Sequence, residues 1–330
     1  MRLGTNISSL TSIVNLNETS RAQTTALRRL SSGRKLNSSA DNAAGYAISK
    51  KMALQIQGLK TASKNVLDGV SLIQTADGAM NQIHDMLQRM RELAVKAANG
   101  TNQLEDKEAI QKEIDQLTSE VNKMRETTEF NKNKIFKNID EDGNYKPTMN
   151  LDLQSGANEN QLMGIPLEEI SAFNLGISGK KGTDGSDRTN NPNAINNSKL
   201  KFTKKSGLTD FYNPKDIDTT VTPNEANEAA IDVTDQESAG LAISAYDAAI
   251  AKVSEIRSQL GAVQNRFEKT IATLDSTNEN ITQAMSRIED ADLAEEMTEF
   301  TKFNILQQAG TSMLAQANQI PQSVLKLLDN

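Results

Sequence analysis

Apolar and small residues recur every three or four positions along much of the chain, which is the spacing of one face of a helix. The longest such stripe comprises Tyr246, Ala249, Val253, Ile256, Leu260, Val263, Phe267, Ile271, Leu274, Ile281, Met285 and Ile288. A stripe of two residues per heptad is too narrow for a single helix to bury alone. The pattern therefore predicts a long helix that packs against other helices.

Two more long helices are expected in the N-terminal part, over about 46–99 and 105–128. Their stripes comprise Val66, Val70, Ile73, Met80, Ile83, Leu87, Met90, Ala94 and Ala97, and then Ile110, Ile114, Leu117, Val121 and Met124. Asn99-Gly100 marks the end of the first helix, because glycine is common just past a helix end. The predicted fold is mainly α, a long antiparallel coiled-coil or helical-bundle rod formed by the N- and C-terminal segments.

Both termini carry a narrow apolar stripe of their own. It comprises Leu3, Ile7, Leu10, Val14, Leu27 and Leu30 at the N-terminus, and Phe303, Leu306, Met313, Ala317, Ile320, Val324 and Leu327 at the C-terminus. Residues 1–45 contain six basic and two acidic residues, a net charge of +4, whereas residues 289–330 contain seven acidic and two basic residues, a net charge of −5. Opposite charges beside matching stripes indicate that the termini pair with each other or with neighbours in an assembly. Solvated faces that differ in sign by coincidence are the alternative.

The middle of the chain has a different composition, and five of the six prolines lie in residues 147–223. Apolar residues alternate with polar ones near 150, which predicts a small β-hairpin in roughly 148–166. Residues 178–225 are rich in Gly, Asn, Lys, Thr and Asp and are expected to form a short variable insertion on the surface. The expected domains are an inner terminal coiled coil with its connector (1–45 and 289–330), a helical rod domain with the hairpin (46–177 and 226–288), and the insertion (178–225).

The composition offers little chemistry. Cysteine is absent and His84 is the single histidine, which excludes thiolate sites and multi-histidine metal sites. The net charge of −7 gives no support for a nucleic-acid or anionic-membrane surface, and no run of about 18 apolar residues occurs. The first residues also lack the layout of a cleavable secretory signal. We expect a protein that is not an enzyme, needs no cofactor or metal, and leaves the cell, if it does, without such a signal.

Long motifs occur in order near both ends of the chain. They lie at 1–10 (Met-Arg-Leu-Gly-Thr-Asn-Ile-Ser-Ser-Leu), 30–49, 68–79, 86–95, 286–297 (Ser-Arg-Ile-Glu-Asp-Ala-Asp-Leu-Ala-Glu-Glu-Met) and 308–319. These motifs closely resemble those of bacterial flagellins, the subunits of the flagellar filament, and the resemblance covers about 1–166 and 238–330. It implies that the termini form a coiled coil lining the filament channel, and that the insertion forms the outer surface.

The resemblance also implies a function, a location and partners. The subunit would polymerise head-to-tail into a helical filament for swimming motility, after export in unfolded form by the flagellar type III system. It would then be an extracellular protein of the flagellum, with terminal helices that order only on polymerisation. The implied partners are further copies of the chain, an export chaperone that binds the C-terminal helix, the filament cap and hook-junction proteins, and the vertebrate Toll-like flagellin receptor. Neither nucleic acid nor a membrane is implied.

The receptor-contact motif of the family corresponds to residues 88–95, with Arg89 and Leu93 as its principal contacts and Glu113 on the next helix. Met90 and Ala94 belong to the predicted stripe and should face the core. All three proposed contact residues lie off that stripe, so we expect them to be exposed.

Three other functions remain open at this stage. A hook-filament junction protein would share the terminal helices and the export route. A soluble coiled-coil adhesin or toxin-translocation factor would differ in having stably folded termini as a monomer. An enzyme within 178–225 is disfavoured, because that segment contains neither histidine nor cysteine.

Overall fold

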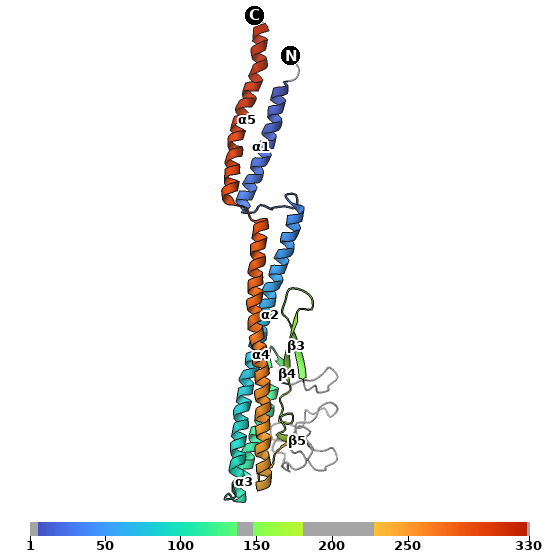
Figure 1. Ribbon diagram of the computed structural model, residues 1–330, viewed down its shortest axis with the longest axis vertical. Coiled ribbons are helices and arrows are strands. Elements are labelled where there is room, and N and C mark those ends of the chain that lie inside the picture. Colours follow the sequence, from blue (N-terminus) through green and yellow to red (C-terminus); the bar gives the residue numbers. More distant parts are fainter. Residues whose placement is uncertain (1–5, 137–147, 181–227, 329–330) are drawn as a thin grey trace. The chain divides into compact units, whose positions relative to one another are not determined.

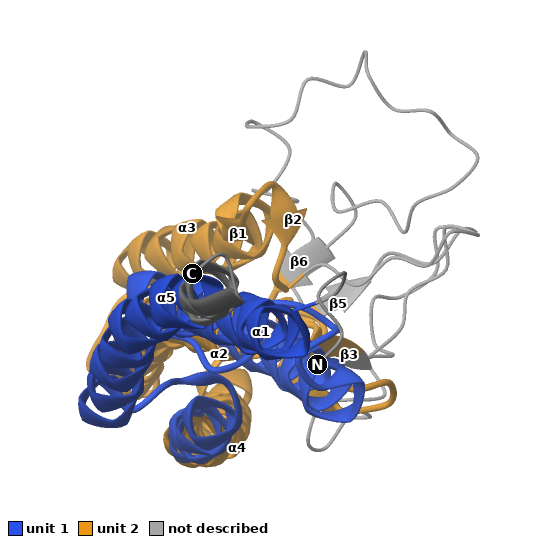
Figure 2. Ribbon diagram, turned by 90° about the horizontal axis from the view of Figure 1, so that it is seen from above, with its two compact units in different colours: residues 1–60, 275–330 blue, residues 61–274 orange. Residues whose placement is uncertain are grey.

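The computed structural model describes residues 6–136, 148–180 and 228–328, which form helices and small two-stranded sheets (Figure 1). These residues are mainly helical, so the predicted fold class is confirmed. The chain divides into two compact units, residues 1–60 with 275–330 and residues 61–274 (Figure 2). The division falls at other positions than the expected domain bounds at 45 and 289, which stay a prediction.

Unit 1 is built around two terminal helices, α1 (Ile7–Ser32) and α5 (Leu293–Leu328). They lie side by side and antiparallel (Figure 1). The side-chain oxygen of Asn6 accepts a hydrogen bond from the Ser9 N–H at 3.2 Å and so caps the start of α1. Gly33, at φ +68°, ends the helix in the left-handed conformation that glycine adopts without strain.

Unit 2 is a bundle of three helices. It contains most of α2 (Ala43–Ala97), all of α3 (Leu104–Thr127) and most of α4 (Gln236–Glu289). Its core includes most of the predicted stripe residues: Val66, Ile73, Met80, Ile83, Leu87, Met90, Ala94, Ala97, Ile110, Ile114, Val121, Tyr246, Ala249, Val253, Ile256, Leu260, Val263 and Phe267. The three helices therefore bury one another's stripes, as the spacing required.

Three two-stranded antiparallel sheets accompany this bundle, and two of them matter for the predictions. The expected hairpin is confirmed as β3 (Thr148–Gln154) and β4 (Leu162–Glu168). β5 (Ser178–Lys180) pairs with β6 (Glu228–Ala230). Backbone hydrogen bonds therefore join the strand just before residues 181–227 to the strand just after them. Most of the predicted insertion lies outside the described residues.

The third sheet is a tight hairpin directly after α3, made of β1 (Glu129–Phe130) and β2 (Asn133–Lys134). Asn131 and Lys132 connect its strands, and both have positive φ. Two such residues form the type of two-residue turn that matches the twist of paired strands.

Buried polar side chains of α3 hold the irregular segments of unit 2. The Gln111 side chain accepts a hydrogen bond from the Val233 N–H at 2.8 Å and donates one to the Ile231 carbonyl at 3.0 Å. Farther along, the Asn122 side chain accepts a hydrogen bond from the Ala172 N–H at 2.9 Å. Each bond satisfies a backbone group that would otherwise be buried without a partner, so α3 fixes the segments on both sides of the insertion.

A close approach of three elements in this unit occurs where α2, α4 and β3 meet. A Cβ atom on Gly69 would lie 2.7 Å from Phe267 and 2.8 Å from Leu153, which is closer than atoms can pack. Gly69 therefore permits this contact because it lacks a side chain. Gly78, on the same helix, has nothing within 4 Å of that position.

We predict that Gly69→Ala and Gly78→Ala have opposite effects on thermal unfolding of the monomer. The added methyl at Gly69 should lower stability by about 1–3 kcal/mol through overpacking. At Gly78 it should raise stability by about 0.5–1 kcal/mol, since alanine is the better helix former and the position is open. Equal effects of the two changes would contradict the close packing around Gly69.

The carboxyl group of Asp115, on α3, lies where burial disfavours its ionised form. Burial raises the pKa of Asp115, and the nearby charge of Asp232 raises it further, although the hydrogen bond from Gln111 at 2.9 Å acts in the opposite direction. Burial, and then the charge of Asp115, also raise the pKa of Tyr246, whose hydroxyl is fully buried and without a hydrogen-bond partner. Ionised Asp115 therefore costs stability in the folded chain.

The pKa of Asp115 predicts a pH-dependent effect of Asp115→Asn. An acid whose pKa is raised by folding favours the folded state below its ordinary pKa, and this contribution is lost as pH rises through the raised pKa. The variant should therefore melt at a higher temperature than the wild type at neutral pH, and at the same temperature below the ordinary carboxyl pKa. Glu255→Gln, at an exposed position of α4, controls for the loss of one charge. A stability difference that does not change with pH would contradict this account.

Candidate assembly surface

The α1–α5 pair is held by a stripe in which small or polar residues alternate with a few large apolar ones. On α5 the least exposed residues recur at alternating spacings of four and three: Glu296, Phe300, Phe303, Gln307, Gly310, Leu314 and Ala317. The Asn6 side chain donates a hydrogen bond to the Ala317 carbonyl at 2.8 Å, and at Gly310 the absent side chain makes room for Leu16. The two termini thus pair with each other, as their charges and stripes predicted.

The pairing uses only part of the predicted stripes. Phe303, Leu30 and Ala317 are half-buried or buried, whereas Ile7, Leu10, Val14, Leu27, Leu306 and Met313 are exposed. Leu10 is 56% exposed and Met313 67% exposed, so the pairing of α1 with α5 does not bury these positions. The reason is geometric, because a pair of helices buries a single stripe of each and these positions lie off it. Their role in assembly stays a prediction. Leu3 lies outside the described residues, as do the side chains of Ile320, Val324 and Leu327.

Exposed apolar residues lie along both helices. We call this set of residues the outer stripe, which comprises Ile7, Leu10, Ile13, Val14 and Leu27 of α1 and Leu293, Met297, Ile305, Leu306 and Met313 of α5. A shallow groove on α5 lies within it, lined by Met297, Thr298, Thr301, Lys302 and Ile305. So much exposed apolar surface on two helices indicates that another chain covers them.

A short crossover joins the terminal pair to the rest of unit 1. Arg34 forms an antiparallel bridge with Asp290, and the Lys35 N–H donates to the Glu289 carbonyl at 2.7 Å. The buried Glu289 carboxylate accepts a hydrogen bond from the Ser49 hydroxyl and pairs with the Arg34 guanidinium at 2.8 Å. Part of the connector that was expected within residues 1–45 is therefore ordered in this unit.

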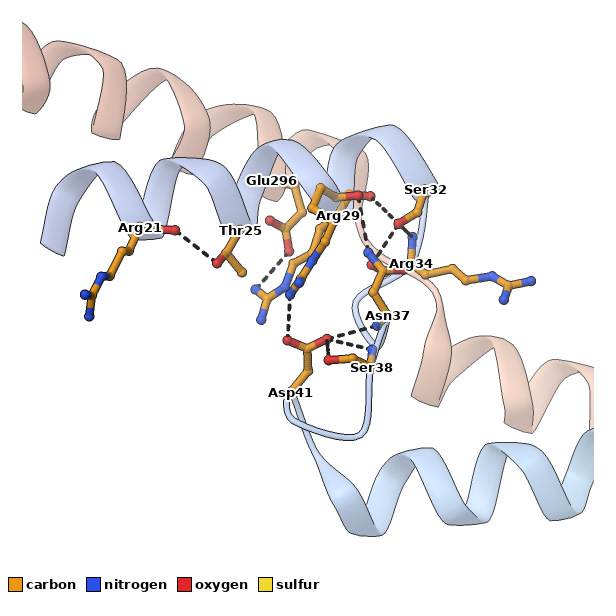
Figure 3. A network of polar contacts seen from close by, with 10 residues as sticks. Arg21, Thr25, Arg29, Ser32, Arg34, Asn37, Ser38, Asp41 and Glu296 are labelled. Atoms are coloured by element: carbon orange, nitrogen blue, oxygen red, sulfur yellow. Dashed lines mark hydrogen bonds and ion pairs between the residues drawn. The ribbon is translucent and has the colours of Figure 1, made fainter. Parts of the chain in front are cut away.

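Polar contacts also order the chain between α1 and α2 (Figure 3). Asp41 accepts hydrogen bonds from the N–H groups of Ser38 at 2.9 Å and Asn37 at 3.1 Å, and it pairs with Arg28 at 2.9 Å. The Ser38 N–H lowers the pKa of Asp41 most, and Asn37 and Arg28 lower it further against the opposing effect of burial.

One ion pair of this region links α1 with α5. The guanidinium of Arg29 pairs with the carboxylate of Glu296 at 3.3 Å, and Figure 3 shows the two side chains turned toward each other. Glu296 is buried against α1. The opposite charges predicted to join the termini thus meet in this contact.

The proposed receptor contacts lie on α2 and α3 of unit 2. Arg89 pairs with Glu113 at 2.8 Å and with Glu92 at 3.3 Å, and all three side chains are exposed. The hydrogen bond and charge of Glu113, followed by those of Glu92, raise the pKa of Arg89. The expected exposure of Leu93 was wrong, because its side chain is only 3% exposed. Leu93 lies three residues after Met90, and the three-helix bundle buries a broader face of α2 than the predicted stripe.

In the part of the chain that the structure describes, no group of His, Cys, Asp and Glu side chains is arranged to hold a metal ion. None of the described helices is long and apolar enough to cross a membrane.

Two family models match the chain and together cover more than half of it. Residues 3–141 match the bacterial flagellin N-terminal helical region, and residues 243–328 match the bacterial flagellin C-terminal helical region. The chain belongs to the bacterial flagellin family. It is accordingly a structural, non-enzymatic subunit of the extracellular flagellar filament.

Known flagellins are similar along nearly the whole length of this one. Flagellin of Bacillus subtilis (strain 168) is 42% identical over 337 residues, which covers 99% of this chain and 100% of the relative. Flagellin of Halalkalibacterium halodurans is 40% identical over 317 residues, covering 96% and 93%. A crystal structure of Bacillus cereus flagellin aligns with 64% of this chain and 88% of its own, at 22% identity and a TM-score of 0.41.

Proposed function

We propose that this flagellin is exported unfolded by the flagellar type III system and joins the filament head-to-tail, and that its terminal helices order only when neighbouring subunits cover them. The observation that carries this proposal is the outer stripe, which stays exposed when α1 and α5 are paired. In this proposal residues 1–45 and 289–330 form the inner coiled coil of the filament, residues 46–177 and 226–288 the rod domain, and residues 178–225 the outer surface.

The energetics of the α1–α5 pair support folding on assembly. Burial of one large aliphatic side chain contributes roughly 1.5–3 kcal/mol. This pair leaves most of its large apolar residues exposed, half-buries a few such as Phe300 and Phe303, and fully buries only small or polar ones. Ordering each backbone residue costs about 1–2 kcal/mol. Covering the outer stripe would supply the missing apolar burial, and this requires further copies of the chain.

The exposure of the outer stripe also supports the proposal of other binding partners, within the cell and at the ends of the filament. Before assembly, the exposed apolar side chains of α5 need protection from aggregation, which suits an export chaperone that binds the C-terminal helix. The filament cap and the hook-junction proteins would cover the same surfaces at the two ends of the filament. The receptor for this flagellin in vertebrates would be the Toll-like flagellin receptor.

We predict that polar substitutions in the outer stripe raise the critical concentration for polymerisation. In Leu10→Gln/Val14→Gln, two exposed apolar side chains can no longer be buried between subunits, and each should cost on the order of tenfold in affinity or more. Seeded polymerisation followed by light scattering measures this effect. Thr11→Gln, at an exposed polar position of the same helix, is the matched control. Wild-type assembly by the double variant would contradict the proposed interface.

For the receptor, we propose Arg89 and Glu113 as direct contacts of the free subunit. Both side chains are exposed, and their ion pair joins neighbouring helices into one charged surface. Leu93 lies beneath this surface and would keep α2 in position through packing. Arginine at a protein interface commonly contributes a large share of the binding free energy.

Exchanging the charges of Arg89 and Glu113 distinguishes a direct contact with the receptor from a role of their ion pair in stabilising the subunit. Arg89→Glu should reduce receptor activation by about tenfold or more, and the double variant Arg89→Glu/Glu113→Arg, which restores an ion pair between the helices, should remain impaired. The matched control exchanges Asp77 and Arg257, which pair at 2.8 Å between α2 and α4. Receptor-dependent reporter activation by soluble monomer is the readout. Full recovery in the Arg89/Glu113 double variant would show that the pair acts only within the subunit.

A further inference from the structure

The turn between α2 and α3 contains the one Asn-Gly pair of the chain, Asn99-Gly100. Both residues are exposed, and Ala98 alone separates them from Ala97, the last residue of α2. Asn-Gly is the sequence in which an asparagine side chain is most easily attacked by the following backbone nitrogen, because glycine has no side chain to obstruct the attack or restrict the backbone. We propose that Asn99 is a site of spontaneous deamidation in the folded flagellin.

The hydrogen bonds of the turn favour this reaction. The Thr101 N–H donates to the side-chain oxygen of Asn99 at 3.2 Å, which turns the Asn99 side chain toward the following peptide and withdraws electrons from its Cγ. The Asn99 carbonyl accepts from the Asn102 N–H at 3.3 Å, and the Asn102 side chain donates to the Lys96 carbonyl at 2.7 Å. None of these bonds uses the Gly100 N–H.

Space around Gly100 is also open. A Cβ atom built at Gly100 would meet one atom within 4 Å, the Gln236 side-chain oxygen at 3.9 Å. The Gly100 nitrogen can therefore approach Cγ without a clash from a neighbouring element. The same observation means that alanine fits at this position without distorting the fold.

The reaction needs only water. The Gly100 nitrogen loses its proton and attacks Cγ of Asn99, a C–N bond forms, and the side-chain nitrogen leaves with that proton as ammonia. Water then opens the resulting succinimide at either carbonyl. One opening gives aspartate and the other gives isoaspartate, in which the main chain passes through the former side chain. Either product has one more negative charge than Asn99.

The products alter the end of α2. A negative charge just past a helix C-terminus is unfavourable, since the last carbonyls already carry partial negative charge. Isoaspartate also adds a methylene to the backbone of a turn that the Asn102 bonds hold at fixed length. Deamidation should therefore loosen the turn where α2 ends and α3 begins.

Incubation of the folded, full-length protein at neutral and mildly alkaline pH tests the proposal. Peptide mass spectrometry, with fragmentation that distinguishes isoaspartate from aspartate, follows Asn99 and also Asn102, which lies in the same turn and precedes Gln103. Asn99 should convert faster than Asn102, mostly to isoaspartate, and at least as fast as it does in chain unfolded by denaturant.

Gly100→Ala is the matched variant, because it keeps the fold and restricts the attacking nitrogen. Conversion of Asn99 should slow several-fold, while circular dichroism and the melting temperature stay close to those of the wild type. The proposal is overturned if Asn99 converts no faster than Asn102, if Gly100→Ala converts as fast as the wild type, or if folding protects Asn99 relative to the unfolded chain.

Discussion

Two paired helices can bury only one stripe of each, and this limit governs the terminal part of the molecule. In the α1–α5 pair, small residues such as Ala26 and Ala317 are buried, Phe300 and Phe303 are only half-buried, and large residues such as Leu10 face outward. The pair therefore leaves most of its large apolar side chains where another chain can cover them. For a filament subunit, this arrangement couples the order of the termini to assembly.

Unit 2 is not subject to the same limit, since three helices enclose a core. Its large side chains, among them Tyr246 and Phe267, are fully buried. Two polar residues of α3 are also buried, and the side chains of Gln111 and Asn122 form hydrogen bonds with backbone groups on either side of the insertion. These bonds hold the chain on both sides of residues 181–227 against α3.

Periodicity predicted the helices well because burial in a bundle follows the helical repeat, and the hairpin was found because its apolar residues alternate. The pattern failed where it could not identify the partner. Leu93 was expected to be exposed because a heptad stripe accounts for packing against one neighbouring helix. In this unit α2 packs against two helices, and the wider buried face includes Leu93. The burial of Gln111 and Asn122 could not be predicted. In the sequence, a polar residue that is buried and hydrogen-bonded cannot be distinguished from one that is exposed to solvent. The pairing of Arg29 with Glu296 was anticipated only through the charge of each terminus.

Hydrogen exchange measured on monomer and on assembled filament tests most directly whether assembly orders the termini. The account predicts that amides of α1 and α5 exchange rapidly in the monomer and are protected in the filament. Amides of α2, α3 and α4 within residues 61–274 should be protected in both states. Strong protection of α1 and α5 in a monomer that forms no filaments would contradict the account, because the helix pair would then be stable without the neighbours that its outer stripe requires.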